Sequence, residues 1–227
     1  MSGVTHCYQP IERHLKLTRG CLEVLAEFRN PVCIITKNQL VTRDIDILTQ
    51  LARVGAISVM ISITTLDDKL RRVLEPRTSH PEHRLRAIQT LSESDIPVGV
   101  LVAPIIAGLN DAEIPAIIKA AVQAGAQRAG YTHLRLPYGV APLFEQWLEE
   151  HVPTKKDKVL NRVRSMRGGQ LNESQFGKRM RGEGIFAEQV ASLFKLACRK
   201  ASLANLSPAL STDAFRRPTG PQLTLLD

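Results

Sequence analysis

The chain has 227 residues, 44% of them hydrophobic, and a formal net charge of +8. This length supports one large domain with a tail, and no apolar run approaches the ~18 residues that a membrane-spanning helix needs. The first ten residues lack a basic leader and an apolar segment, so we expect no secretory signal and a cytoplasmic location.

The first 56 residues predict alternating helices and a strand. After a strand end and loop over residues 1–8, helical spacing covers residues 18–28 and stops at Asn30-Pro31. An apolar strand is expected over residues 32–36. Thr42 is placed to begin the next helix and Gly55 to end it.

The stretch from Ile57 to Asp67 organises the rest of the chain. Its apolar residues alternate with small polar ones, with Met60 as the exception. Such alternation predicts a strand with two different faces. One apolar and one hydroxyl-bearing face suit a barrel wall that has helices outside and a ligand cavity inside. An ordinary strand with one wet face is the alternative.

Two helices and two strands are expected to follow. A short helix is predicted over Asp67 to Leu74, and Ser79 with Pro81 opens another. The next strand ends at Ala103, residues 104–109 form a loop, and Asn110-Asp111 caps a helix that ends at Gly125. The last strand is predicted over residues 128–136.

Strands separated by helices indicate a βα repeat and a parallel sheet with right-handed crossovers. A flavodoxin-like open sheet also fits this alternation. Polar residues at or just past the strand ends favour ligand binding at that edge, which holds for barrels and for open sheets. After Gly139 the pattern is helical only, and from about Leu203 no apolar period continues.

The polar residues at the strand ends are candidates for ligand contacts. Lys37 is placed to pair an anion, with a solvated surface lysine as the alternative. Ser62 and Thr64 offer hydroxyls for a ribose or amino-acid group, unless neighbouring backbone already satisfies them. Glu75, Arg77 and Arg84 suit the two ends of a zwitterion, or form a surface ion-pair network. His133, in the last strand, is expected to be structural.

Two C-terminal features suggest macromolecular partners. A glycine-rich basic segment is a candidate DNA contact, and its candidate residues are Arg162, Arg164, Arg167, Lys178, Arg179 and Arg181. The stretch Gln222–Leu226 resembles the short peptide by which bacterial repair proteins hold the sliding clamp, although a terminal aromatic residue is absent.

Several stretches together resemble one protein family. They are YQPIER (8–13), LTRGCLEVLAEFRNPVCIITKN (17–38), VTRDIDIL (41–48), ISITTLD (61–67), EPRTSHPEHRL (75–85), PVGVLVAPIIAGLND (97–111), LRLP (134–137) and RGGQLNESQFGKRMRGEG (167–184). The combination is similar to the radical SAM proteins related to spore photoproduct lyase, often labelled DNA repair photolyases. The resemblance covers about residues 5–200.

The resemblance implies a fold and two cofactors. The fold is an α/β, incomplete (β/α)6 TIM-like barrel over residues 1–139. Beyond it, the residue pattern itself predicts a C-terminal helical extension over 140–201 and a disordered tail over 202–227. The cofactors are a 4Fe–4S cluster and S-adenosylmethionine, which is cleaved reductively to a 5′-deoxyadenosyl radical. The residues implied to hold S-adenosylmethionine are Thr36, Lys37, Ser62 and Thr64, with Glu75 and Arg84 nearby, and Pro104, Ile105, Asn110 and Leu136 facing the adenine.

One departure from the family is large. The family holds its cluster with three cysteines spaced C-x3-C-x2-C, and thiolates are needed to bind the iron. This sequence lacks that motif, and we expect its four cysteines (Cys7, Cys21, Cys33 and Cys198) to be small buried apolar groups rather than metal ligands. We therefore expect a truncated chain that cannot cleave S-adenosylmethionine alone, with an open sheet edge that a missing segment or a partner would cover.

Three functions are compatible with these residues. The first is a radical SAM lyase-like enzyme, with DNA repair as its expected setting, that lacks its cluster-binding segment. The second is a non-catalytic basic module that binds DNA and the sliding clamp. The third is an α/β remnant without a ligand.

Overall fold

The computed structural model describes residues 7–175, 179–203 and 210–217. Its centre is a parallel sheet of four strands in the order β1-β2-β3-β4. The strands are β1 (Val32–Thr36), β2 (Ile57–Ile63), β3 (Val98–Ile105) and β4 (Ala129–His133). Val32 lies opposite Ile57, Val59 opposite Val98 and Val100 opposite Ala129. The α/β class and the parallel sheet are thus confirmed.

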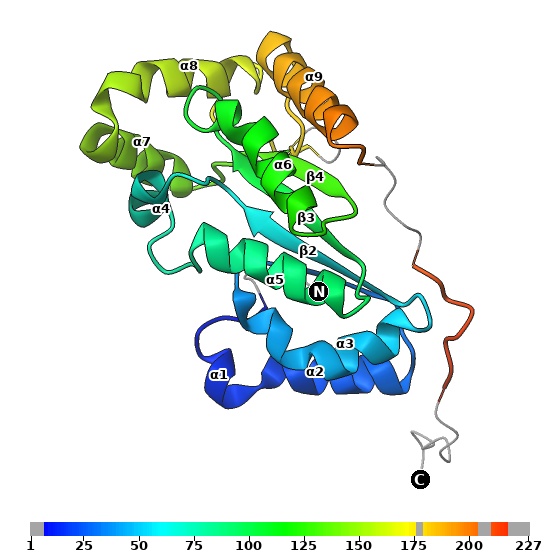
Figure 1. The fold of residues 1–227 in the computed structure, drawn as a ribbon. Helices are drawn as coiled ribbons and strands as arrows, with labels where there is room; N and C mark the ends of the chain where they lie inside the picture. The colour runs from blue at the N-terminus through cyan, green and yellow to red at the C-terminus, as the bar shows by residue number, and fades with distance from the viewer. Residues whose placement is uncertain (1–6, 176–178, 204–209, 218–227) are drawn as a thin grey trace.

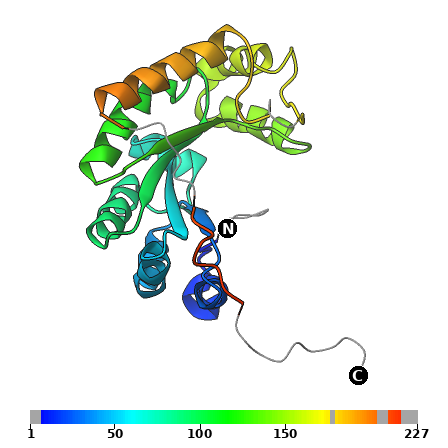
Figure 2. The ribbon, with the colours of Figure 1, turned by 90° about the vertical axis from the view of Figure 1, so that its right-hand side faces the viewer.

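The sheet is curved, and the helices between its strands lie on its convex side (Figures 1 and 2). Spatial order follows chain order without the reversal that a doubly wound sheet requires. This arrangement fits a segment of a barrel wall better than a flavodoxin-like sheet. The described strands form an open sheet and do not close into a barrel.

The elements of the N-terminal half follow the predicted alternation. The helical segments are α1 (Glu12–Leu15), α2 (Leu17–Glu27), the 3-10 turn η1 (Gln39–Asp44), α3 (Ile45–Ala52), α4 (Asp68–Leu74), α5 (Pro81–Glu93), the 3-10 turn η2 (Asp111–Glu113) and α6 (Ile114–Gln123). Asp67 caps α4 as expected, because its side chain accepts hydrogen bonds from the backbone N–H groups of Lys69 and Leu70.

Several predicted boundaries were wrong. Asn38, rather than Thr42, provides the first cap after β1, because its side chain accepts from the Leu40 N–H and starts η1. The cap of α5 is His80 and not Ser79.

The last two strands also end elsewhere than predicted. β3 continues past Ala103 to Ile105, since the Leu134 N–H donates to the Ile105 carbonyl. β4 ends at His133 and not at residue 136.

The core lies between the sheet and the helices on its convex side. Ile57, Val59, Ile61 and Ile63 are all buried there, as the alternation predicts. On the opposite face, Gly99 lies directly under the side chain of Arg128. A Cβ at Gly99 would lie 2.3 Å from Cγ of Arg128 and 2.8 Å from its carbonyl oxygen, so only glycine fits this close approach.

The C-terminal part is helical. It consists of α7 (Val140–His151), the 3-10 turn η3 (Pro153–Lys155), α8 (Lys156–Ser165) and α9 (Ile185–Lys200). Helices α7 and α8 enclose a second apolar cluster that includes Leu136, Phe144 and Leu148. They lie beyond the carboxyl ends of the strands, whereas α9 packs beside α6 (Figure 1).

Residues 210–217 lie in the segment predicted to be a disordered tail, and the structure gives them a defined path. The Ser211 N–H donates to the Gly55 carbonyl and the Arg216 N–H to the Phe28 carbonyl, each over 3.0 Å. This segment therefore crosses the loops that precede β1 and β2, opposite the carboxyl edge of the sheet. None of the described helices is long and apolar enough to cross a membrane.

Candidate functional site at the carboxyl edge of the sheet

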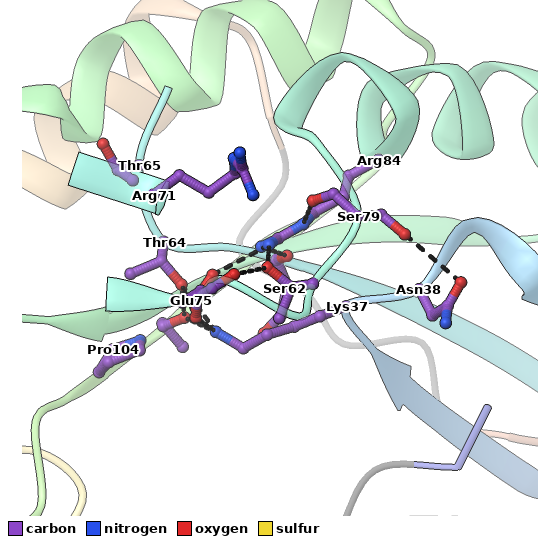
Figure 3. A network of polar contacts seen from close by, with 12 residues as sticks. Lys37, Asn38, Ser62, Thr64, Thr65, Arg71, Glu75, Ser79, Arg84 and Pro104 are labelled. Atoms are coloured by element: carbon purple, nitrogen blue, oxygen red, sulfur yellow. Dashed lines mark hydrogen bonds and ion pairs between the residues drawn. The ribbon is translucent and has the colours of Figure 1, made fainter. Parts of the chain in front are cut away.

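Lys37, which follows β1, connects the ends of three strands (Figure 3). Its ammonium donates to the Thr64 hydroxyl after β2 over 2.7 Å and to the Ala103 carbonyl in β3 over 3.0 Å. It also forms an ion pair with the Glu75 carboxylate. Because parallel strands end at the same edge, residues far apart in sequence converge on this one amine.

Glu75 follows α4 and carries the negative charge of the network. One oxygen, Oε1, lies 2.8 Å from the Thr64 hydroxyl, and Oε2 accepts from the Arg84 guanidinium over 2.9 Å. The Thr64 hydroxyl is also 2.7 Å from the Ala103 carbonyl, so its single hydrogen serves one acceptor at a time. Both Glu75 and Lys37 keep only a small part of their side chains exposed.

Arg84 is held inside the network by the start of α5. Its side chain is 1% exposed, and besides Glu75 it donates to the Ser79 carbonyl over 2.8 Å and the Ser62 carbonyl over 3.0 Å. Arg84 thus contacts the backbone of Ser62, whose hydroxyl was predicted to contact a ligand.

The network holds more positive than negative charge. Burial lowers the pKa of Lys37, although the attraction of Glu75 opposes this. Burial also opposes ionisation of Glu75, but the charges of Lys37 and Arg84 outweigh it and lower the pKa of that carboxyl. Burial lowers the pKa of Arg84, and the nearby charge of Arg71 adds to the effect. Two buried cations thus share one carboxylate, and a further anion would be favourable here.

The loop after β3 is tied to the end of β2. Asn110 is 2% exposed; its amide nitrogen donates to the carbonyls of Thr64 (2.8 Å) and Pro104 (3.0 Å), and its oxygen accepts from the Ile106 N–H (2.7 Å). Asn110 thereby orders the loop with both ends of its amide.

Glu113 makes a similar connection that the sequence did not reveal. Its carboxylate accepts from the Thr65 hydroxyl over 2.6 Å and from the Leu66 N–H over 2.7 Å. No spacing or motif around Glu113 indicates that it reaches across to the end of β2.

Most of the predicted cofactor residues gather at this edge, and some do not join the network. Lys37, Thr64, Glu75 and Arg84 contact one another. The Thr36 hydroxyl contacts the Cys7 carbonyl instead, over 3.4 Å. The other predicted residues are placed as follows: Ser62 buried in β2, Pro104 bound through its carbonyl by Asn110, Ile105 in the main core, Leu136 in the second apolar cluster, and Arg77 exposed. Their roles in binding stay predictions.

The basic segment is spread over several local interactions. Arg162 pairs with Asp111 over 3.3 Å and stacks on Phe186, and Arg164 lies 3.8 Å from Glu145. Arg167 is 5% exposed and donates to the carbonyls of Leu134 and Arg179.

These contacts hold parts of the basic segment within the fold. DNA binding by its exposed residues stays a prediction. Among the described basic residues, Arg179 and Arg181 lie in the turn before α9. Lys178 and the stretch Gln222–Leu226 lie outside the described residues.

The cysteines do not fit an iron–sulfur cluster. In the described part of the chain, which includes all four cysteines, no group of three or more His, Cys, Asp or Glu side chains is arranged to hold a metal ion. Burial raises the pKa of Cys7 to about 11, and its thiol points to the Ile35 carbonyl. A 4Fe–4S cluster needs several thiolates held close together, and the described residues provide no such group.

The network does fit part of S-adenosylmethionine. Its excess of positive charge suits the carboxylate of the amino acid, while Glu75 offers a partner for the ammonium. The cavity beside Lys37, lined also by Tyr8, Asn38 and Thr78, measures only about 50 Å³. S-adenosylmethionine is larger than this cavity. It would therefore have to extend from the network over the concave face of the sheet.

Comparisons with known proteins identify two relatives of this chain. The chain is 35% identical over 113 residues to the uncharacterized protein MJ0683 of Methanocaldococcus jannaschii, which covers 50% of this chain and 42% of that protein. It is 32% identical over 107 residues to the uncharacterized protein Rv2578c of Mycobacterium tuberculosis, covering 47% of this chain and 32% of that one. The aligned part thus spans less than half the length of these relatives.

Residues 2–121, more than half of the chain, match the family model of the Radical SAM superfamily. This range includes β1, β2 and β3 and every member of the charged network. The chain therefore belongs to the Radical SAM superfamily.

Proposed function

We propose that this chain provides the S-adenosylmethionine-binding part of a radical SAM enzyme that resembles the spore photoproduct lyase-like proteins. The observation that carries the proposal is the buried set of Lys37, Glu75 and Arg84 at the converging ends of three strands. Its unequal charge favours an amino-acid carboxylate, and its position is the edge where α/β folds bind ligands.

Each residue has a distinct part in this proposal. Lys37 binds the carboxylate as a mobile point charge, and Glu75 orients Lys37 and attracts the ammonium. Arg84 holds Glu75 in place while its other bonds fix it to the carbonyls of Ser62 in β2 and Ser79 before α5, so it is a positioning residue. Asn110 keeps the loop after β3 in the conformation that borders the ligand.

The reductive chemistry needs thiolates that this chain does not arrange. We therefore propose that the chain by itself binds S-adenosylmethionine without cleaving it. Anaerobic reconstitution with iron and sulfide is expected to give less than one cluster per chain, measured by iron content and visible absorbance. A stoichiometric 4Fe–4S cluster on this chain would contradict the proposal.

The binding step has a test that does not depend on activity. Isothermal titration calorimetry with S-adenosylmethionine is expected to show saturable binding, and its decarboxylated analogue is expected to bind about tenfold more weakly. Changing the ligand leaves the folding of the protein untouched. Equal affinity for the two ligands would contradict the proposed contact with the carboxylate.

A pair of variants locates the contact. Lys37→Met should weaken the binding of S-adenosylmethionine by about tenfold or more, so that the two ligands bind with similar affinity. Lys119→Met, in the exposed surface of α6, is the matched control and should change neither affinity. Circular dichroism would confirm that both variants fold.

A further inference from the structure

The outer edge of β4 carries backbone N–H and C=O groups that do not pair with any other described strand. The Val100 N–H donates to the Arg128 carbonyl, and Val100 lies opposite Ala129. In a parallel pair, successive residues turn alternately to one side and the other, so Ala129 and Tyr131 turn their N–H and C=O groups away from β3. His133 follows the same direction, because its N–H donates to the Met180 carbonyl over 3.1 Å.

These outward groups are open in the described structure. Ala129 and Tyr131 have no backbone hydrogen-bond partner on that side among the described residues. The turn that contains Met180 covers only the carboxyl end of β4. Among the described residues, the edge from Ala129 to Tyr131 therefore remains free for pairing.

A groove of about 350 Å³ lies along this free edge. Gly130 and Tyr131 of β4 form one wall, and Ala191, Phe194 and Lys195 of α9 form the other. The three α9 residues are spaced i, i+3 and i+4, which places them on one face of the helix. Figure 1 shows α9 running beside α6 close to β4.

The groove combines an apolar floor with a basic rim. The rings of Tyr131 and Phe194 lie 4.6 Å apart, centroid to centroid. Arg181 and Lys195 contribute the charged side chains, and no acidic side chain of the described residues lines the groove. The charge of Arg181 is near enough to the Tyr131 hydroxyl to oppose the rise in its pKa that burial causes.

We propose that this groove binds an extended acidic segment of a partner polypeptide, which pairs with the outer edge of β4. A strand offers alternating N–H donors and C=O acceptors, as the open edge of Ala129 and Tyr131 requires. A nucleic-acid backbone offers phosphate acceptors but not alternating donors, so it would leave the outward carbonyls unpaired. A carboxylate on the segment would meet Arg181 and Lys195.

The proposal is independent of S-adenosylmethionine binding, since the groove and the charged network share no residue. The probe is a fluorescein-labelled, capped eight-residue peptide of alternating valine and aspartate. Fluorescence anisotropy is expected to show saturable binding with a Kd below about 1 mM. The same peptide with alternate amides N-methylated should bind at least about tenfold more weakly, because it cannot pair with a strand edge.

Protein variants test the rim. Arg181→Glu and Lys195→Glu should each weaken peptide binding by about tenfold. Arg199→Glu, on an exposed part of α9 outside the groove, is the control and should change the Kd by less than about twofold. Amide hydrogen exchange should show added protection of Ala129 and Tyr131 when the peptide is bound.

Three results would overturn the proposal. These are absence of saturable binding, equal binding of the N-methylated peptide, and unchanged exchange at Ala129 and Tyr131. Tighter binding of a single-stranded oligothymidylate that Arg181→Glu abolishes would assign the groove to nucleic acid instead. None of these outcomes bears on the calorimetry with S-adenosylmethionine.

Discussion

Around the ends of β1, β2 and β3, the buried cations Lys37 and Arg84 both pair with the carboxylate of Glu75. Along β4 the opposite holds, because Arg128 and His133 are buried with nitrogen atoms that have no hydrogen-bond partner in the described protein. The first region is the one that we propose binds S-adenosylmethionine. The second keeps polar groups whose burial is a cost in this chain alone. Four predictions test this difference.

The largest effect is expected for Glu75→Gln. This change leaves Lys37 and Arg84 buried without a counter-charge, and breaking a buried pair costs about 3–5 kcal/mol. The free energy of unfolding, measured with urea, should fall by that amount. Glu93→Gln, at the exposed end of α5, is the control. A loss below about 1 kcal/mol would mean that the network resembles a surface ion pair.

The second prediction concerns pH and His133. Burial, with a smaller contribution from the charge of Arg167, lowers the pKa of His133 from 6.5 to about 4. The unfolded chain therefore binds more protons between these values. The stability contributed by neutral His133 is complete above pH 6.5 and is lost as the pH falls toward 4.

The expected loss is about 3 kcal/mol over this pH range. His133→Phe should flatten the dependence in urea titrations at each pH, whereas His14→Phe, at an exposed position, should leave it unchanged. A steep dependence that survives in His133→Phe would assign the acid sensitivity to other groups.

The third prediction has the opposite sign from the first. Arg128→Met removes a buried guanidinium whose Nε and Nη2 are unpaired, and keeps the apolar stem over Gly99. The free energy of unfolding should rise by about 1–2 kcal/mol, because the desolvation cost of the unpaired donors disappears. If Arg128→Met lowers the free energy of unfolding instead, the Arg128 guanidinium has favourable partners, as the charges at the carboxyl edge do.

The smallest effect is expected for Asp67→Ala. Asp67 caps α4, the helix that immediately precedes Glu75, and lies exposed at its start. Loss of the cap should cost about 1 kcal/mol. Asp67→Asn should restore most of it, since the amide oxygen still accepts from the helix. A loss as large as that of Glu75→Gln would mean that the cap determines the position of the whole network.

The sequence predicted more of the elements than of the contacts. The alternation from Ile57 to Ile63 and the apolar spacing of α5 and α6 depend on local periodicity, which a sequence displays directly. The capping errors at Thr42 and Ser79 arose because neighbouring polar residues compete for the same role. The tertiary contacts of Asn38 and Ser79, which join β1 to the start of α5, decide between them.

From the sequence, a residue of the candidate site could be predicted only where it lies directly after a predicted strand. Lys37 and Thr64 belong to that class. Glu113 does not, because it lies 48 positions beyond the Thr65 hydroxyl that it binds, and nothing local indicates this contact. Likewise, no pattern shows that Arg84 uses the carbonyl of Ser62 and not its hydroxyl.

The sequence by itself determined the βα alternation, the convergence of polar residues at one edge, and the lack of a cysteine triplet, because periodicity and composition are properties of the chain. Only the tertiary structure decided that Glu75 would lie between two cations, and that no other described segment would pair with the edge of β4 at Ala129 and Tyr131. Those outcomes depend on which side chains meet across loops and helices, and that is settled by packing and by the need to pair buried charges.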